Sequence, residues 1–145
     1  MKKIIEREWY AVCDRLNSLG YIALSDDEKL WVNVRSLIDS INNGGLISYF
    51  YNSYADHFDD CMSALDHLDA ADVRVKVQII SDLFPRGHLS SIIERNEIIN
   101  AFPKDSKRDR VLEKIDDELY GLIDGLENKL EAHVVKFLSK GRYNR

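Results

Sequence analysis

The chain has 145 residues, of which 45% are hydrophobic and 31% charged, and its formal net charge is −5. This length and composition predict one globular domain and argue against a disordered or fibrous chain. We find no apolar run long enough for a membrane span, no secretory signal, and too few cysteines for a disulfide framework, so we expect a reduced, cytoplasmic protein.

The N-terminal part contains two amphipathic helical patterns. The first spaces its apolar residues at intervals of three and four along one helix face: Ile5, Trp9, Val12, Leu16 and Leu19. The second opens with Ser25 and Glu28 at the spacing of a capping box and stops at the pair Gly44-Gly45. Its apolar stripe comprises Leu30, Trp31, Val34, Leu37, Ile38 and Ile41. We expect residues 1–39 to form a helical pair packed on the rest of the domain.

The next segment, residues 46–53, is too short for its periodicity to be diagnostic, and we interpret it as a helical turn or short helix. Its last residues, Asn52 and Ser53, are typical of caps and turns because their side chains bond the nearby backbone. A helix is predicted after them, with an apolar arc that comprises Phe58, Cys61, Met62, Leu65 and Leu68.

Four aspartates lie on the opposite, solvent-facing arc of a projection of this helix that starts at Asp56: Asp56, Asp59, Asp60 and Asp66. Asp69 and Asp72 would fall inside the apolar arc if the helix continued. The helix should therefore end near Leu68 and leave both residues in the turn that follows.

Residues 73–84 fit two patterns. Strict alternation of valine and isoleucine with polar residues over residues 73–79 is typical of a strand. Val73, Val77, Ile80 and Phe84 also share one helix face. A lone strand would leave its backbone groups unpaired, and no second convincing strand is present, so we favour a helix.

The C-terminal third is predicted to be helical throughout. Ser91 and Glu94 have the spacing of a helix cap, and the helix after them should end before Pro103. Two further helices follow, and the last has a buried face that comprises Leu126, Leu130, Val134 and Phe137. The expected fold is an all-α, single-domain bundle of about seven or eight helices over residues 1–145.

Acidic charge is concentrated in one part of the chain. Residues 36–73 contain seven aspartates and no lysine or arginine. Like charges three or four residues apart destabilise a helix by about 0.2–0.5 kcal/mol per pair. Selection for stability alone would therefore not favour this pattern. One interpretation is a solvated helix face. The other is a surface for a cationic partner, because carboxylates about 5–6 Å apart resemble the phosphates along a DNA strand.

The stretch from Asn43 to Pro85 resembles the core of the DNA-mimic protein family. The shared pattern is a glycine pair, an aromatic stretch that ends in Asn-Ser, an aspartate, Ala-Leu and a closing Phe-Pro. It is matched here by Gly44, Gly45, Phe50, Asn52, Ser53, Asp56, Ala64, Leu65, Phe84 and Pro85. A later acidic-aromatic motif is matched by Asp116, Asp117, Glu118 and Tyr120. The resemblance covers roughly residues 40–138.

This resemblance implies an all-helical fold, a homodimer, and an acidic surface that imitates duplex DNA and occupies a DNA-binding transcription regulator. We expect a non-enzymatic protein that needs no cofactor and binds a basic nucleic-acid-binding protein rather than nucleic acid or membrane. The predicted partner-binding residues are Asp56, Asp59, Asp60, Asp66, Asp69 and Asp72, with Asp116, Asp117 and Glu118 as a second rim.

Other functions stay open at this point. An immunity-type inhibitor of a basic toxin nuclease would use the same electrostatics, and an enzyme would need a concave site around His57 and Cys61. We assign no catalytic residue and no metal ligand, because Cys61 faces the apolar arc and His67 lies on a different azimuth from His57. The basic segment from Lys104 to Arg110 either begins a solvated helix or pairs with the acidic block.

Overall fold

Helices account for almost all of the chain that the computed structural model describes, which is residues 2–84, 91–101 and 107–143. The α-helices are α1 (Lys2–Leu19), α2 (Asp26–Gly44), α3 (Leu46–Tyr51), α4 (Phe58–His67), α5 (Ala71–Ser81), α6 (Ile92–Asn100), α7 (Lys107–Tyr120) and α8 (Ile123–Tyr143). Two 3-10 helices, η1 (Tyr21–Ala23) and η2 (Ser53–His57), complete the order. These ranges contain no strand, so the all-α prediction is confirmed. Of the ambiguous residues 73–84, residues 73–81 lie in helix α5.

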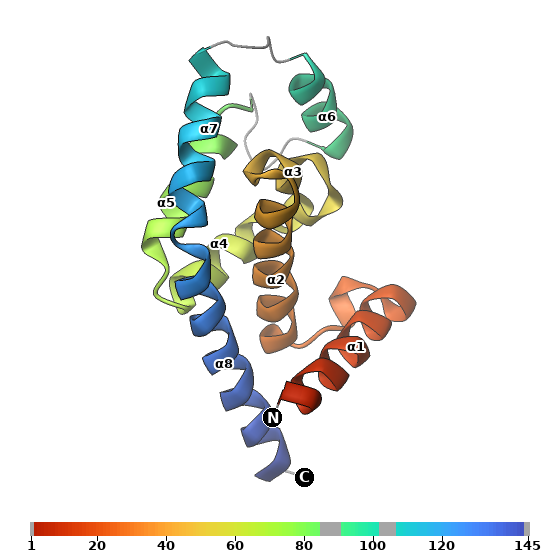
Figure 1. Ribbon diagram of the computed structural model, residues 1–145. Coiled ribbons are helices and arrows are strands. Elements are labelled where there is room, and N and C mark those ends of the chain that lie inside the picture. Colours follow the sequence, from red (N-terminus) through yellow and green to blue (C-terminus); the bar gives the residue numbers. More distant parts are fainter. Residues whose placement is uncertain (1, 85–90, 102–106, 144–145) are drawn as a thin grey trace.

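Helix α2 is the centre of the domain. It contacts α3, α4, α7, α8 and η2, and Figure 1 shows it standing between α1 and α8. Its stripe is buried, and Val34, Leu37, Ile38 and Ile41 are fully excluded from solvent. The predicted capping box is confirmed: Ser25 Oγ accepts a hydrogen bond from the Glu28 amide, and Glu28 Oε1 accepts one from the Ser25 amide.

Helix α1 lies at the edge of the domain and diverges from α2 (Figure 1). Val12 is its buried residue, and Trp9 packs against Trp31 with ring centroids 5.2 Å apart. An ion pair between Arg15 and Glu28 also joins the two helices. The two helices of the expected N-terminal pair therefore differ in burial: α1 lies on the surface of the core, whereas α2 forms the centre of the core.

The acidic segment folds largely as expected. Helix α4 ends at His67, close to the predicted end, because Asp69 adopts a left-handed backbone with φ of 56° that breaks the helix. Two positions differ from the prediction. Asp56 lies in η2 rather than in the following α-helix, and Asp72 lies in the first turn of α5 rather than in a turn. The left-handed residue reverses the chain within a few residues, so α5 begins before Asp72.

The C-terminal helices complete the bundle. The predicted cap of α6 is confirmed, since Ser91 Oγ accepts a hydrogen bond from the Glu94 amide at 3.2 Å. Helix α8 buries Leu126, Leu130 and Val134, and Figure 1 shows it running along the domain beside α2. Pro85, Pro103 and part of the basic segment lie outside the described residues. Among the helices that are described, none has both the length and the apolar character needed to cross a membrane.

Candidate protein-binding surface

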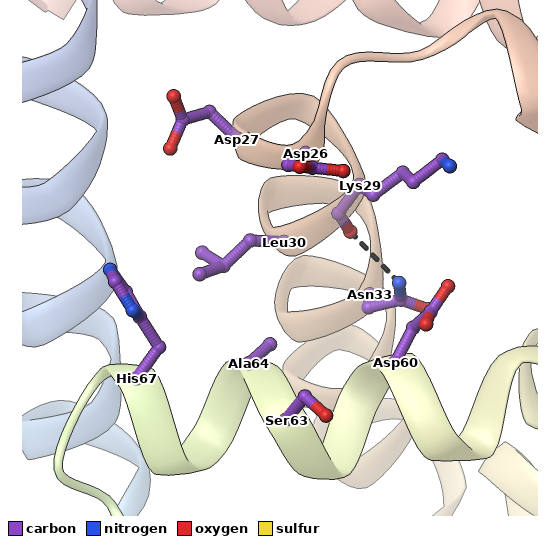
Figure 2. A pocket seen from close by; sticks show the side chains of 9 residues that line it. All are labelled: Asp26, Asp27, Lys29, Leu30, Asn33, Asp60, Ser63, Ala64 and His67. Atoms are coloured by element: carbon purple, nitrogen blue, oxygen red, sulfur yellow. Dashed lines mark hydrogen bonds between the residues drawn. The ribbon is translucent and has the colours of Figure 1, made fainter.

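An acidic groove of about 310 Å³ lies between the N-terminal half of α2 and helix α4 (Figure 2). Figure 2 shows Leu30 and Ala64 between the two helices, with polar side chains around them. The groove is lined by Asp26, Asp27, Lys29, Leu30, Asn33, Asp60, Ser63, Ala64 and His67. Three carboxylates therefore surround an apolar strip in a concavity that holds one lysine.

Two of these carboxylates, Asp26 and Asp27, were not among the predicted site residues. They open α2 directly after its cap, where acidic side chains complement the partial positive charge of a helix N-terminus. The run of three acids, residues 26–28, was a visible signal, but it is read most simply as helix capping. The packing of α4 across α2 is what places Asp26 and Asp27 beside Asp60, and no local pattern in the sequence indicates that packing.

Asp60 is held in place by a hydrogen-bond chain. The Tyr21 hydroxyl donates to Asp60 Oδ2 and accepts from Asn33 Nδ2 at 2.8 Å. Asn33 Nδ2 also donates to the Lys29 carbonyl at 2.9 Å. Burial, and then the hydrogen bond to Asp60, raise the pKa of Tyr21 above its ordinary value, so the hydroxyl stays neutral. The neutral hydroxyl therefore holds the Asp60 side chain in one orientation at the groove.

The outer end of the groove meets helix α8. His133 Nε2 lies 2.9 Å from Asp27 Oδ1, and the rings of His67 and His133 meet edge to face with centroids 5.1 Å apart. These contacts tie the start of α2 and the end of α4 to α8. They fix the position of Asp27 relative to the groove.

Asp56, the first of the predicted binding residues, binds a buried cation of the same chain. The Arg95 side chain is only 1% exposed, and its Nη2 donates to Asp56 Oδ1 at 3.0 Å. Arg95 also donates to the carbonyls of Phe50 at 2.7 Å and Asn52 at 3.0 Å. This network joins α6 to α3 and η2, so Asp56 has a structural role in the domain.

Two more predicted acids are paired with cations of α5. Asp66 Oδ1 lies 3.1 Å from Arg74 Nε, and Glu118 contacts Lys76 Nζ. The ammonium of Lys76 lowers the pKa of Glu118. Such exposed pairs contribute little to stability, but they reduce the negative charge that a partner meets. The charges of Asp66, Glu118 and Asp56 are thus partly neutralised by Arg74, Lys76 and Arg95, respectively.

The predicted second rim lies away from the groove. Asp116 Oδ1 accepts a hydrogen bond from the Leu46 amide at 2.8 Å and thereby caps the start of α3. Burial raises the pKa of this carboxyl. Leu46 follows the C-terminal end of α2, whereas the groove lies at its N-terminal end. Asn33, which lines the groove with Asp60, lies about 16 Å along α2 from the helix end at Gly44, so the structure does not bring Asp116, Asp117 and Glu118 together with Asp60.

The remaining predicted residues, Asp59, Asp69, Asp72 and Asp117, have exposed side chains. Asp59 is next to Asp60 in the first turn of α4. Asp72 Oδ1 accepts from the Val73 amide at 2.9 Å, and the Asp69 carbonyl accepts from Lys129 Nζ at 2.6 Å. Of the predicted binding residues, Asp60 is therefore the one that lines the groove.

The residues considered for nucleophilic or metal chemistry do not assemble such a site. The Cys61 side chain is fully buried, and burial raises the pKa of its thiol to about 12, so the thiolate is scarce at neutral pH. His57 instead stacks on Tyr21, with ring centroids 3.6 Å apart. Within the part of the chain that the structure describes, no three His, Cys, Asp or Glu side chains are grouped as metal ligands.

Comparisons with known proteins identify the family but no individual relative. No curated protein and no solved structure matches the chain at a significant level. A family model described as "DMP19-like protein" matches residues 22–137, a range that contains the acidic groove and excludes helix α1. The match agrees with the resemblance to DNA-mimic proteins. The chain belongs to the DMP19-like protein family.

Proposed function

We propose that the protein acts without catalysis, by occupying the nucleic-acid-binding surface of a basic partner with its acidic groove. The observation that carries the proposal is the gathering of Asp26, Asp27 and Asp60 from two helices around one concavity. Membership of a DNA-mimic family supports the same direction. A DNA-binding transcription regulator is the partner class that this family membership favours.

The groove presents negatively charged oxygen acceptors to a partner's arginine or lysine, as the phosphates of a DNA backbone do. Such a side chain normally donates to phosphate oxygens, and carboxylate oxygens accept charge-assisted hydrogen bonds in the same way. The apolar strip formed by Leu30 and Ala64 suits the methylene stem of that side chain. The net charge of −5 is modest, so the local density of carboxylates, rather than the total charge, would drive the recognition.

A pull-down with charge-matched baits tests this function. The groove variant carries Asp26→Asn, Asp27→Asn and Asp60→Asn. The control variant carries Glu6→Gln, Asp14→Asn and Asp124→Asn, which are exposed positions outside the groove. Each variant removes three negative charges, so a difference between them reports position rather than net charge.

We expect wild type and the control variant to retain a DNA-binding protein at low salt, and we expect duplex DNA to release it. The groove variant should retain much less, because the carboxylates that accept from the partner's cations are gone. Equal retention by both variants would refute the role of the groove. A nuclease recovered in place of a regulator would support the inhibitor alternative, with the same groove and a different partner.

A further inference from the structure

A second concavity, the N-terminal pocket, lies between α1, η1, α2 and η2 and has a volume of about 450 Å³. It is larger than the acidic groove, and Asn33 is the residue that lines both. Its volume falls in the range of about 300–1,000 Å³ that is common for small-molecule sites. Nothing in the proposed function uses this pocket.

The walls of the N-terminal pocket are rich in aromatic rings that other contacts hold in place. Trp9, Tyr21 and Tyr54 line it from three different elements. The Trp9 ring packs on Trp31, and Tyr21 is fixed through its hydroxyl and by stacking on His57. Rings that are already ordered lose little side-chain entropy when a ligand binds.

An acidic side chain lines the pocket beside the His57 imidazole. Asp56 lines it with a side chain that is 46% exposed, and among the described residues no lysine or arginine lines it. Arg95 binds Asp56 Oδ1 from the interior and offsets part of its charge, but the Arg95 side chain is 1% exposed and cannot contact a ligand. Aromatic faces attract cations through their negative quadrupole. The Lys29 ammonium lies 5.2 Å from the centroid of the Tyr21 ring, and His57 stacks on that ring, so Tyr21 already has a cation of this chain beside it. A positively charged ligand is attracted instead by the Trp9 and Tyr54 rings and by the Asp56 carboxylate.

Helix α1 is what closes the pocket. Trp9, Cys13 and Asn17 come from α1, which precedes the range matched by the family model. The pocket is thus built partly from residues that the family match does not include. A ligand held there would contact α1 and η2 together.

We propose that the N-terminal pocket binds a small aromatic ammonium compound, with its ring between the aromatic walls and its ammonium group toward Asp56. This site goes beyond the proposed function and does not depend on it. The recognising chemistry is a flat apolar ring joined to a primary or quaternary amine.

Isothermal titration calorimetry with tryptamine tests this assignment on the full chain at about pH 8, where imidazole groups are ordinarily neutral. Indole-3-propionate is the matched probe, since it carries the same ring with a carboxylate in place of the amine. We expect tryptamine to bind at least about tenfold more tightly than indole-3-propionate. Equal affinities, or no heat from tryptamine at millimolar concentration, would overturn the proposal.

A pair of matched variants shows whether binding occurs in this pocket. Ser36→Tyr fills it from α2, where the side chain is only partly exposed, whereas Ser18→Tyr makes the same change at an exposed α1 position that does not line it. We expect Ser36→Tyr to weaken tryptamine binding by about tenfold or more and Ser18→Tyr to leave it nearly unchanged. Circular dichroism confirms that both variants stay folded. Should a folded Ser36→Tyr variant bind as wild type does, the site lies elsewhere and the assignment is wrong.

Discussion

The ion pair between Asp56 and Arg95 gives the sharpest stability prediction. Asp56→Ala removes the carboxylate, while the buried guanidinium still donates to the carbonyls of Phe50 and Asn52. A hydrogen bond to a charged group contributes about 1.5–3 kcal/mol, and loss of one partner of a buried pair costs about 3–5 kcal/mol. Because the Asp56 side chain is 46% exposed, water can replace part of the interaction. We therefore expect a loss of about 2 kcal/mol.

Arg95→Ala should cost more than Asp56→Ala. It removes the hydrogen bonds to Phe50, Asn52 and Asp56, leaves the carbonyls of Phe50 and Asn52 without this donor, and opens a cavity where a fully buried side chain stood. We expect a loss of about 4 kcal/mol. The double variant should lose less than the sum of the two single losses, because the second change removes a partner that is already lost.

Urea denaturation followed by far-UV circular dichroism measures these losses. The midpoint should fall while the dependence of the free energy of unfolding on urea stays constant, since the surface exposed on unfolding is similar. Asp14→Ala, at an exposed position of α1, is the matched control and should change stability by less than about 0.5 kcal/mol. If Asp56→Ala were as stable as Asp14→Ala, the structural role of Asp56 would be refuted.

Three further predictions concern other contacts of the fold. Gly45→Ala should destabilise the protein by about 2 kcal/mol or more, because φ is +82° and the new Cβ would lie 2.4 Å from Asp116 Oδ2. Gly125→Ala, with no atom near its new Cβ, should instead stabilise helix α8. Thermal unfolding compares the two variants, and equal shifts of the melting temperature would contradict this account. Burial raises the pKa of Asp116 in the folded state, so the native protein binds more protons between the unfolded and folded pKa values and its stability falls as pH rises through that window. Asp116→Asn keeps an acceptor for the Leu46 amide, so it should gain stability relative to wild type as pH rises above about 4, the ordinary pKa of aspartate. A stability difference that stays constant with pH in denaturation curves would argue against the assignment. Tyr21→Phe should lower the free energy of unfolding in urea by about 1 kcal/mol, because the hydrogen bonds to Asp60 and Asn33 are lost. An unchanged midpoint would show that these two hydrogen bonds are not formed.

Local patterns predicted the helices well because the signals were local. The Ser25 and Ser91 caps and the left-handed turn at Asp69 lie within a few residues of the helix ends that they define. Residues 73–79 carried a misleading alternation. Burial of Val73 and Val77 on one face of α5 decides for the helix, together with the absence of a strand partner in the described ranges.

The surface was harder to predict because it depends on tertiary packing. Sequence spacing placed Asp56 and Asp66 on a solvent-facing arc, but it carried no information about Arg95 and Arg74, which pair with them. Asp26 lies more than thirty residues from Asp60, and only the crossing of α2 and α4 brings both to one groove. Charge counted along the chain therefore indicated helix α4, which forms one wall of the groove, but not the carboxylates of α2 that line the other wall.

The central claim, that the acidic groove takes the place of DNA, is tested most directly by competition. Fluorescence anisotropy of a labelled duplex bound to the purified partner measures the release of DNA as this protein is added. We predict that wild type and the charge-matched control release the duplex, that the groove variant releases it at least about tenfold less effectively, and that release weakens steeply as salt increases. A stable ternary complex of partner, duplex and this protein, or equal release by the groove variant and the control, would contradict the claim.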